Sequence, residues 1–283
     1  MYISDCLVTL NPTAEVTIRG NGAKNGAGIY IHDSSPDDPV TSDNLGGSGD
    51  TGDPAAYDAI TQASTPIDKR VGLSVGEIGN DYNGFLNFID NKATVSGGAV
   101  CVNKGHFYLH SDNIAVIGNR AEESGGGVAV LKGNFTMTKG SIGEAERANT
   151  AKNGGGVYVS DGEVWFKGGS VQYNEATDGG GAYVTGGRII MIDGSLNNNT
   201  ATEKGGGAYA AGNFRMLGGT VGGEEGGNKA VNGGGVYVNE GNVYVIYGEI
   251  TYNHASMDGG GFFISADKKS SDAVSYTHLT LPT

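Results

Sequence analysis

The chain has few cysteines and no long apolar run. Cys6 and Cys101 lie far apart in the sequence, without companions at the spacing of a disulfide framework or a zinc site. No apolar stretch approaches the ~18 residues that a membrane-spanning helix needs. The opening segment lacks the basic start and apolar core of a signal peptide, yet strand-like sequence follows at once. We therefore expect no disulfide framework, metal site or membrane span, and a natural N-terminus upstream of Met1.

Basic residues are also scarce. The net charge is −13, and an acidic surface repels phosphate backbones, so we expect no nucleic-acid partner. No Cys–His or P-loop arrangement is present, and the sequence predicts no catalytic residues and no cofactor. The 52 glycines show no Gly-X-Y period, which excludes collagen.

What the chain does contain is a repeat of ~27 residues. Seven glycine pairs or triplets, each followed by a short apolar strand, are preceded by an asparagine, and an alanine stands two residues after that asparagine. The asparagines are Asn91, Asn119, Asn149, Asn174, Asn199, Asn228 and Asn253, and a weaker eighth copy begins at Asn21. The glycines suit a corner that needs positive φ, and stacked asparagines suit a ladder of turns.

Each repeat predicts three short strands. The first is of the Val-Tyr-Val type, and the second alternates apolar and polar residues. The third is a single apolar anchor: Ile114, Ile142, Val171, Leu196, Val221 and Ile250. Such units bury little alone and need stacked neighbours. The sequence therefore predicts an all-β fold, a single-stranded parallel β-helix (solenoid) of about eight coils of ~27 residues.

Two short motifs carry a family resemblance. Gly97-Gly98-Ala99-Val100 is of the Gly-Gly-Ala-aliphatic type, and Phe88-Ile89-Asp90-Asn91 is of the Phe-x-x-Asn type. Over about residues 14–266 the chain resembles the chlamydial polymorphic outer membrane proteins and related β-helical adhesins. The resemblance implies a right-handed coil and a bacterial surface adhesin or autotransporter passenger, and it specifies no receptor.

Two segments depart from the repeat within a domain that we place at residues 1–272. Residues 32–69 are rich in proline and aspartate, and we expect a solvated acidic loop, or a loop that calcium or a receptor orders. The end of the chain, 273–283, contains Val-Ser-Tyr-Thr-His-Leu-Thr-Leu-Pro-Thr, which resembles a translated sequencing adaptor. We expect this tail to be an artefact, with the natural protein continuing beyond Asp272.

Outward-facing aromatic residues are the candidate binding sites. The middle residue of the first strand is aromatic in five consecutive coils: Tyr158, Tyr183, Tyr209, Tyr237 and Phe263. Such a stripe can bind a sugar or a protein partner, or it can stabilise the face by stacking on itself. On the second strand, Trp165 and Tyr244 face outward, either in an exposed apolar patch or under another segment.

The functional expectation is a non-catalytic cell-surface or secreted β-helix, an adhesin-like passenger or stalk that contacts a host or neighbouring-cell protein or glycan as a monomer. The alternative is a carbohydrate-active enzyme or glycan-binding module on the same scaffold, and a plain spacer is a third possibility. Glu163 is the one outward carboxylate on the second face, which is a thin set for a lyase or hydrolase.

Overall fold

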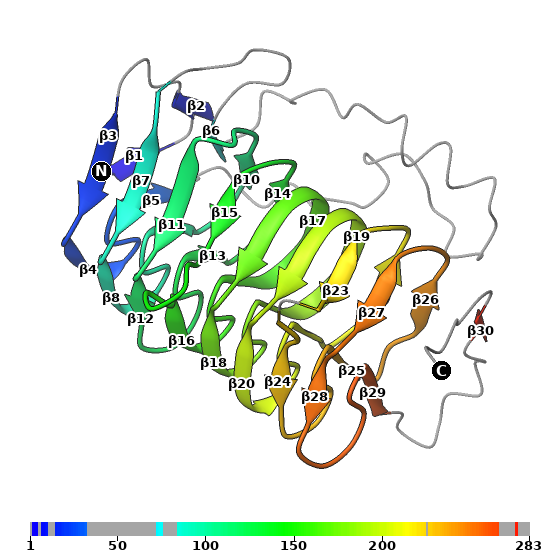
Figure 1. Ribbon diagram of the computed structural model, residues 1–283. Helices are drawn as coiled ribbons and strands as arrows, with labels where there is room; N and C mark the ends of the chain where they lie inside the picture. Colours follow the sequence, from blue (N-terminus) through cyan, green and yellow to red (C-terminus); the bar gives the residue numbers. More distant parts are fainter. Residues whose placement is uncertain are drawn as a thin grey trace.

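The computed structural model describes the backbone of residues 2–4, 7–10, 15–32, 72–75, 84–224, 226–265 and 275–276, and the side chains of 15–32, 84–224 and 226–265. Within these residues the chain forms β-strands and no helix, in a 22-stranded and an 8-stranded parallel sheet. Figure 1 shows the coils stacked side by side from the N-terminal to the C-terminal end, winding in the right-handed sense. The prediction of a right-handed parallel β-helix is confirmed.

The larger sheet wraps three faces of the coil. Two strands, β17 (Val157–Gln172) and β19 (Ala182–Asn197), run through all three faces. The first face is completed by β1 (Tyr2–Ser4), β5 (Ile29–His32), β9 (Val100–Val102), β13 (Val128–Val130), β21 (Ala208–Ala210), β25 (Val236–Asn239) and β29 (Phe262–Ser265).

The other two faces follow in the same coils. The second face contains β2 (Leu7–Leu10), β6 (Gly72–Val75), β10 (His106–Leu109), β14 (Phe135–Met137), β22 (Phe214–Met216), β26 (Val243–Val245) and β30 (Ser275–Tyr276). The third contains β3 (Val16–Arg19), β7 (Leu86–Ile89), β11 (Ile114–Ile117), β15 (Ser141–Ile142), β23 (Thr220–Gly222) and β27 (Glu249–Thr251).

A fourth short strand follows each repeat asparagine and was not predicted. These strands form the 8-stranded sheet: β4 (Gly22–Asn25), β8 (Lys92–Ser96), β12 (Arg120–Ala121), β16 (Thr150–Asn153), β18 (Glu175–Asp178), β20 (Thr200–Lys204), β24 (Lys229–Ala230) and β28 (His254–Ala255). Most contribute one buried residue, the repeat alanine, such as Ala176 or Ala201. Strands this short give no alternating pattern in the sequence.

The core is a set of columns of equivalent residues. Flanking residues of the first strand and alternate residues of the second point inward and are buried, as the pattern predicts. On the second face Phe107, Phe135, Val164, Ile189 and Phe214 pair in register from coil to coil. Each inward residue therefore packs on its equivalent about 4.8 Å away along the axis.

The asparagine corner is held by a continuous side-chain ladder. The amide of Asn174 shows the pattern: its Nδ2 donates to the carbonyl of Ile142 (2.9 Å) and to Oδ1 of Asn199 (3.0 Å). Its Oδ1 accepts from Nδ2 of Asn149 (2.9 Å). Six of these asparagines, from Asn91 to Asn228, are fully buried. The ladder thus satisfies the polar groups of a tight corner inside the protein.

The glycine corner needs glycine for two reasons. The first glycine of each run is left-handed, with φ of +64° at Gly179. A Cβ there would lie 2.4 Å from the carbonyl oxygen of Ala182. The left-handed conformation alone does not exclude side chains, because Gly20 before the first ladder asparagine has φ of +66° and nothing within 4 Å of a Cβ. The first position of the glycine corner therefore has no room for a Cβ, whereas the asparagine corner has.

Two details of the prediction were wrong. Six complete turns join Asn91 to Asn253, so the count of about eight coils is slightly high; the earlier interval, Asn21 to Asn91, contains residues outside the described ranges. The anchor of one coil was also misplaced, because Val116 and not Ile114 pairs with Ile142. Both residues are buried, and Ile114 pairs with Leu86, so spacing alone selected the wrong apolar residue.

Two predicted segments lie almost entirely outside the described residues. The acidic loop at 32–69 is described only at His32, and the expected artefact tail at 273–283 only at the backbone of Ser275–Tyr276. That backbone forms β30, which pairs in parallel with β26.

Candidate functional site

The five predicted aromatic residues of the first face form one continuous stack, here called the aromatic stack (Tyr158, Tyr183, Tyr209, Tyr237 and Phe263). Successive ring centroids are 5.7, 4.4, 5.2 and 5.0 Å apart. The interplanar angles are 15°, 6°, 6° and 11°, so the rings are close to parallel. Register pairing between neighbouring strands brings them together.

Stacking hides much of each ring. Tyr209 and Tyr237 are 8% and 7% exposed, whereas Tyr158, Tyr183 and Phe263 stay partly exposed. Burial raises the pKa of the Tyr183 and Tyr209 hydroxyls above their usual range. The ammonium group of Lys204 lies 5.6 Å from the centroid of the Tyr237 ring. The stack therefore stabilises its own face, and what it offers a partner is ring edges and hydroxyls.

Trp165 on the second face is braced by polar groups. Its indole N–H donates to Oε2 of Glu163 (2.8 Å), and the other carboxylate oxygen of Glu163 pairs with Nε of Arg188 (2.6 Å). The ammonium group of Lys167 lies 5.3 Å from the ring centroid. The structure therefore places Trp165 in a charged cluster and not in an exposed apolar patch.

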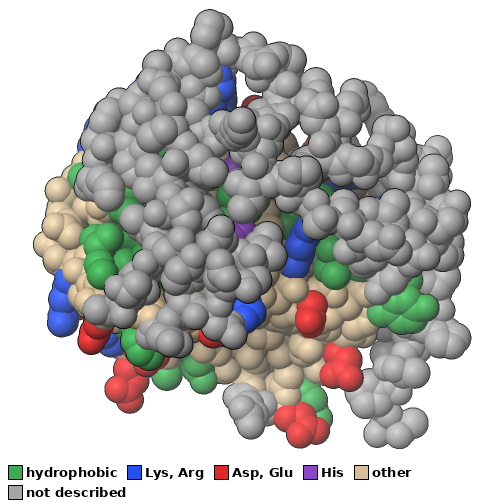
Figure 2. All heavy atoms as spheres, turned by 90° about the horizontal axis from the view of Figure 1, so that it is seen from above, with side chains coloured by type: hydrophobic (Ala, Val, Ile, Leu, Met, Phe, Trp, Pro, Cys, Tyr) green, Lys and Arg blue, Asp and Glu red, His purple; other side chains and the backbone are tan. Residues whose placement is uncertain are grey.

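Tyr244 shares the outward column of Trp165 but is separated from it by Ile190 and Arg215. These two intervening side chains are 3% and 6% exposed. Figure 2 views the molecule from above, turned from Figure 1, and basic and acidic side chains are interspersed on the part of the described surface that is visible there. Among the residues with described side chains, no group of three or more His, Cys, Asp or Glu is placed to hold a metal ion.

A cleft at the asparagine corner was not predicted. We call it the corner trough; its volume is about 660 Å³. It is lined by Asp90, Gly118, Glu146, Arg147, Ala148, Thr150, Tyr173, Glu175, Asn198, Thr200 and Lys229. Most of these residues either precede a ladder asparagine or follow one directly. Lining up those two positions over successive repeats identifies the residues that flank the ladder, but it does not show that they surround a cleft.

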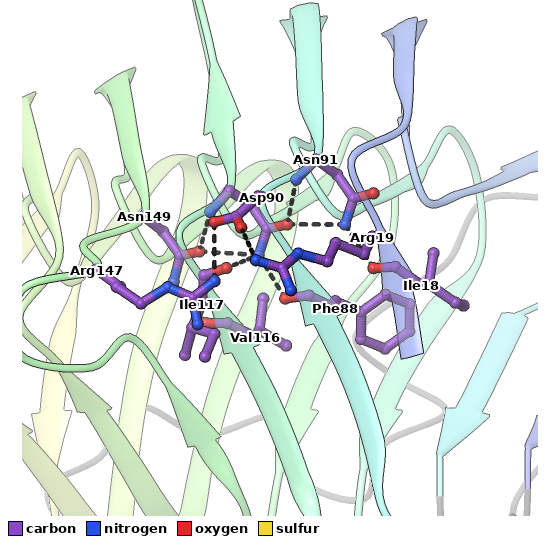
Figure 3. Close-up of polar contacts among 10 residues, drawn as sticks. Ile18, Arg19, Phe88, Asp90, Asn91, Val116, Ile117, Arg147 and Asn149 are labelled. Atoms are coloured by element: carbon purple, nitrogen blue, oxygen red, sulfur yellow. Dashed lines mark hydrogen bonds and ion pairs between the residues drawn. The ribbon is translucent and has the colours of Figure 1, made fainter. Parts of the chain in front are cut away.

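One end of the trough is fixed by a carboxylate between two guanidinium groups. Asp90 pairs with Arg19 (3.0 Å) and with Arg147 (2.9 Å), as Figure 3 shows. Arg147 reaches Asp90 across the coil of Gly118, where a Cβ would lie 2.4 Å from the Asp90 carboxylate. The hydrogen bond from Arg147 has the largest effect and lowers the pKa of Asp90; burial opposes it, and the hydrogen bond from Arg19 lowers the pKa further. These two ion pairs join successive coils on the outside of the corner.

We expect Asp90→Asn to lower the free energy of unfolding at pH 7 by less than about 1 kcal/mol, because the carboxylate is substantially exposed. The pKa of Asp90 is lower in the folded protein than in the unfolded chain. The contribution of Asp90 to the free energy of unfolding is therefore complete above the unfolded-state pKa of about 3.9, and it is lost as the pH falls through the folded-state pKa. Urea unfolding between pH 7 and pH 2.5 should therefore show the variant and the wild type converging only below about pH 4.

Asp112→Asn is the control, since its pair with Lys139 is isolated and Asp112 is 72% exposed. A difference between wild type and Asp90→Asn that persists unchanged at pH 2.5 would contradict the electrostatic account.

Comparison with known proteins gives one match. Residues 85–103 match the family model described as the Chlamydia polymorphic membrane protein repeat. They span β7, the ladder residue Asn91, β8 and β9, which is one asparagine corner and one glycine corner. Neither the curated proteins nor the solved structures give a significant match. No described residue belongs to a helix long and apolar enough to cross a bilayer. The chain is thus a parallel β-helix that resembles the polymorphic outer membrane protein and autotransporter-passenger type.

Proposed function

We propose that this chain is part of an adhesin-like passenger that acts at the cell surface by contacting a protein or glycan on another cell. The observation that carries the proposal is the match of residues 85–103 to a membrane-protein repeat that recurs here as stacked coils. Coils of this kind form a rigid rod that displays outward side chains. The matched repeat favours the surface as the location.

The outward positions support a binding role more than a purely structural one. The inward columns are apolar in every coil, while the outward column of Trp165 and Tyr244 changes character, with Ile190 and Arg215 buried between them. We propose the partly exposed rings of the aromatic stack, with Trp165 and Tyr244, as contacts for a protein partner, because aromatic side chains dominate many binding surfaces.

Cell binding tests this proposal. Fluorescently labelled chain, incubated with epithelial and bacterial cells, should bind at least one surface saturably, and protease or periodate treatment of the cells will separate protein from glycan receptors. Alanine at Tyr158, Tyr183 and Phe263, the partly exposed rings, should weaken binding to a protein receptor at least several-fold. Saturable binding to none of the surfaces would contradict the adhesin proposal. Full binding by a folded triple variant would make the aromatic stack a spacer.

A carbohydrate-active enzyme is the second candidate, favoured by the carboxylates of the corner trough. Asp90, Glu146 and Glu175 line it together with Arg147. However, Asp90 has a lowered pKa, whereas a general acid needs a raised one. Incubation of the chain with plant and bacterial polysaccharides, followed by detection of new reducing ends or unsaturated products, decides the matter. Products that disappear in Glu175→Gln would establish the enzyme.

A further inference from the structure

The corner trough lies beside two insertions in the third face. Each leaves the face at a left-handed glycine that follows the apolar anchor, Gly143 (φ +94°) or Gly222 (φ +92°). Each turns back sharply: the N–H of Arg147 donates to the carbonyl of Glu144 (3.2 Å), and that of Gly226 donates to Gly223 (3.1 Å). Residue 225 of the second insertion is outside the described residues.

The insertions belong to the coils of Asn149 and Asn228, and the coils of Asn174 and Asn199 between them have none. Three coil spacings separate the insertions, or about 14 Å. Tyr173 and Asn198 lie in the two intervening coils, and the N–H of Asn198 donates to the carbonyl of Gly226 in the second insertion (3.1 Å). Along the axis, the trough runs from the coil of Asn91 to that of Asn228, and Tyr173 and Asn198 lie in the part of it between the two insertions.

Strained backbone is concentrated at the trough. Six non-glycine residues in the described chain have positive φ, and four of them line the trough: Asp90 (+54°), Glu146 (+66°), Tyr173 (+55°) and Asn198 (+54°). The left-handed conformation costs a side-chain-bearing residue about 1–2 kcal/mol. Glycine fits the same corner position elsewhere, as Gly118 does with φ of +66°. Where a residue other than glycine occupies such a strained position, its side chain is expected to have a function.

The lining combines one aromatic ring with planar polar groups. Tyr173 supplies the ring, Arg147, Glu175 and Asn198 supply hydrogen-bonding planes, and Thr150 and Thr200 supply hydroxyls. Three carboxylates face two cations, and Arg147 is already paired with Asp90, so neither sign dominates. The trough therefore has no excess of charge that would attract a strongly charged ligand. The volume of about 660 Å³ lies within the ~300–1,000 Å³ of small-molecule sites.

We propose that the corner trough binds a neutral oligosaccharide, with the ring of Tyr173 against the C–H face of one sugar. The polar groups around it would exchange hydrogen bonds with the sugar hydroxyls, which act as both donors and acceptors. The proposal deepens the adhesin function and rests on it by naming the receptor chemistry of one site.

The chain offers a matched control for testing this site. Tyr252 precedes Asn253 as Tyr173 precedes Asn174, and it has the same left-handed backbone (φ +58°), but it does not line the trough. Glycine at either position removes the ring and relieves the strained conformation, so both variants should fold. Circular dichroism and thermal unfolding of each variant verify this before binding is measured.

Wild type, Tyr173→Gly and Tyr252→Gly are applied to a printed array of neutral and acidic oligosaccharides, and the strongest neutral binder is then titrated by calorimetry. We expect wild type and Tyr252→Gly to bind alike and Tyr173→Gly to bind at least about tenfold more weakly. Glu175→Gln should weaken binding as well and leave the fold unchanged.

Three results would overturn the proposal: no neutral oligosaccharide bound by wild type, preference for acidic glycans, or equal losses in the two tyrosine variants. The cell-binding assay separates this failure from failure of the adhesin proposal. A chain that binds cells but no neutral oligosaccharide keeps the adhesin function and loses the sugar site, whereas a chain that binds neither loses both.

Discussion

Replacing Asn174 by alanine should lower the free energy of unfolding by about 3 kcal/mol, one of the two largest single-residue effects that we expect. The side chain is completely buried, and its amide joins two neighbouring coils. Alanine would remove the Nδ2 donor to the carbonyl of Ile142 and one of the two acceptors of Asn149 Nδ2, inside the protein where a lost hydrogen bond is costly. Losses within a buried network exceed the value of one isolated hydrogen bond.

Urea unfolding followed by circular dichroism measures this effect, and Asn197→Ala is the matched control. Asn197 lies in the next coil, where it pairs in register with Gln172, and its Oδ1 is buried without a hydrogen-bond partner. Its removal should therefore change the stability by less than about 1 kcal/mol, in either direction. Similar losses in the two variants would mean that the ladder does not hold the corner.

Gly179→Ala should destabilise the protein by a similar amount, about 3 kcal/mol. The new Cβ would have to accept φ near +64° and lie 2.4 Å from the carbonyl oxygen of Ala182 in the same chain turn. The position of the Cβ is set by the backbone, and the oxygen belongs to the backbone of the same tight corner, so neither atom can move away without opening the corner.

Gly181→Ala, two residues later, tests whether position within the glycine run matters. The equivalent residue in an earlier coil is Ala99, which is fully buried and tolerated. A Cβ at Gly181 would lie 2.5 Å from the carbonyl oxygen of Gly207 and 2.9 Å from Nδ2 of Asn199, so the corner must shift to admit it, as it does around Ala99. Gly181 lacks the left-handed φ of Gly179, and we therefore expect Gly181→Ala to cost about 2 kcal/mol, less than Gly179→Ala, when the two thermal transitions are compared. A larger loss in Gly181→Ala than in Gly179→Ala would contradict the roles assigned to these glycines.

The sequence predicts the scaffold well because its physical requirements recur in every coil. A left-handed corner without room for a Cβ admits glycine, a buried corner ladder admits asparagine, and the small space beneath it admits alanine. Three such positions coupled at one spacing identify a β-helix. The misplaced anchor Ile114 shows the limit, since two buried apolar residues in one short strand satisfy the same pattern.

The sites are harder to predict because they depend on what does not recur. The register of the aromatic stack follows from the repeat, but the burial of Tyr209 and Tyr237 depends on how closely the rings approach. The corner trough is lined by residues from successive coils, from Asp90 to Lys229, which are far apart in the chain and each unremarkable there. The insertion that supplies Arg147 also interrupts the period, which hides its alignment with Asp90.

Hydrogen exchange at single-residue resolution tests the central claim, that buried asparagines join the coils into one continuous ladder. The backbone N–H groups of Asn91, Asn119, Asn174, Asn199 and Asn228 each donate to the side chain of the next asparagine. The account predicts that these five amides exchange among the slowest in the protein, together with the core strands, and far more slowly than those of the exposed turn at Glu144–Glu146. Exchange of the asparagine amides as fast as that of this turn would contradict it.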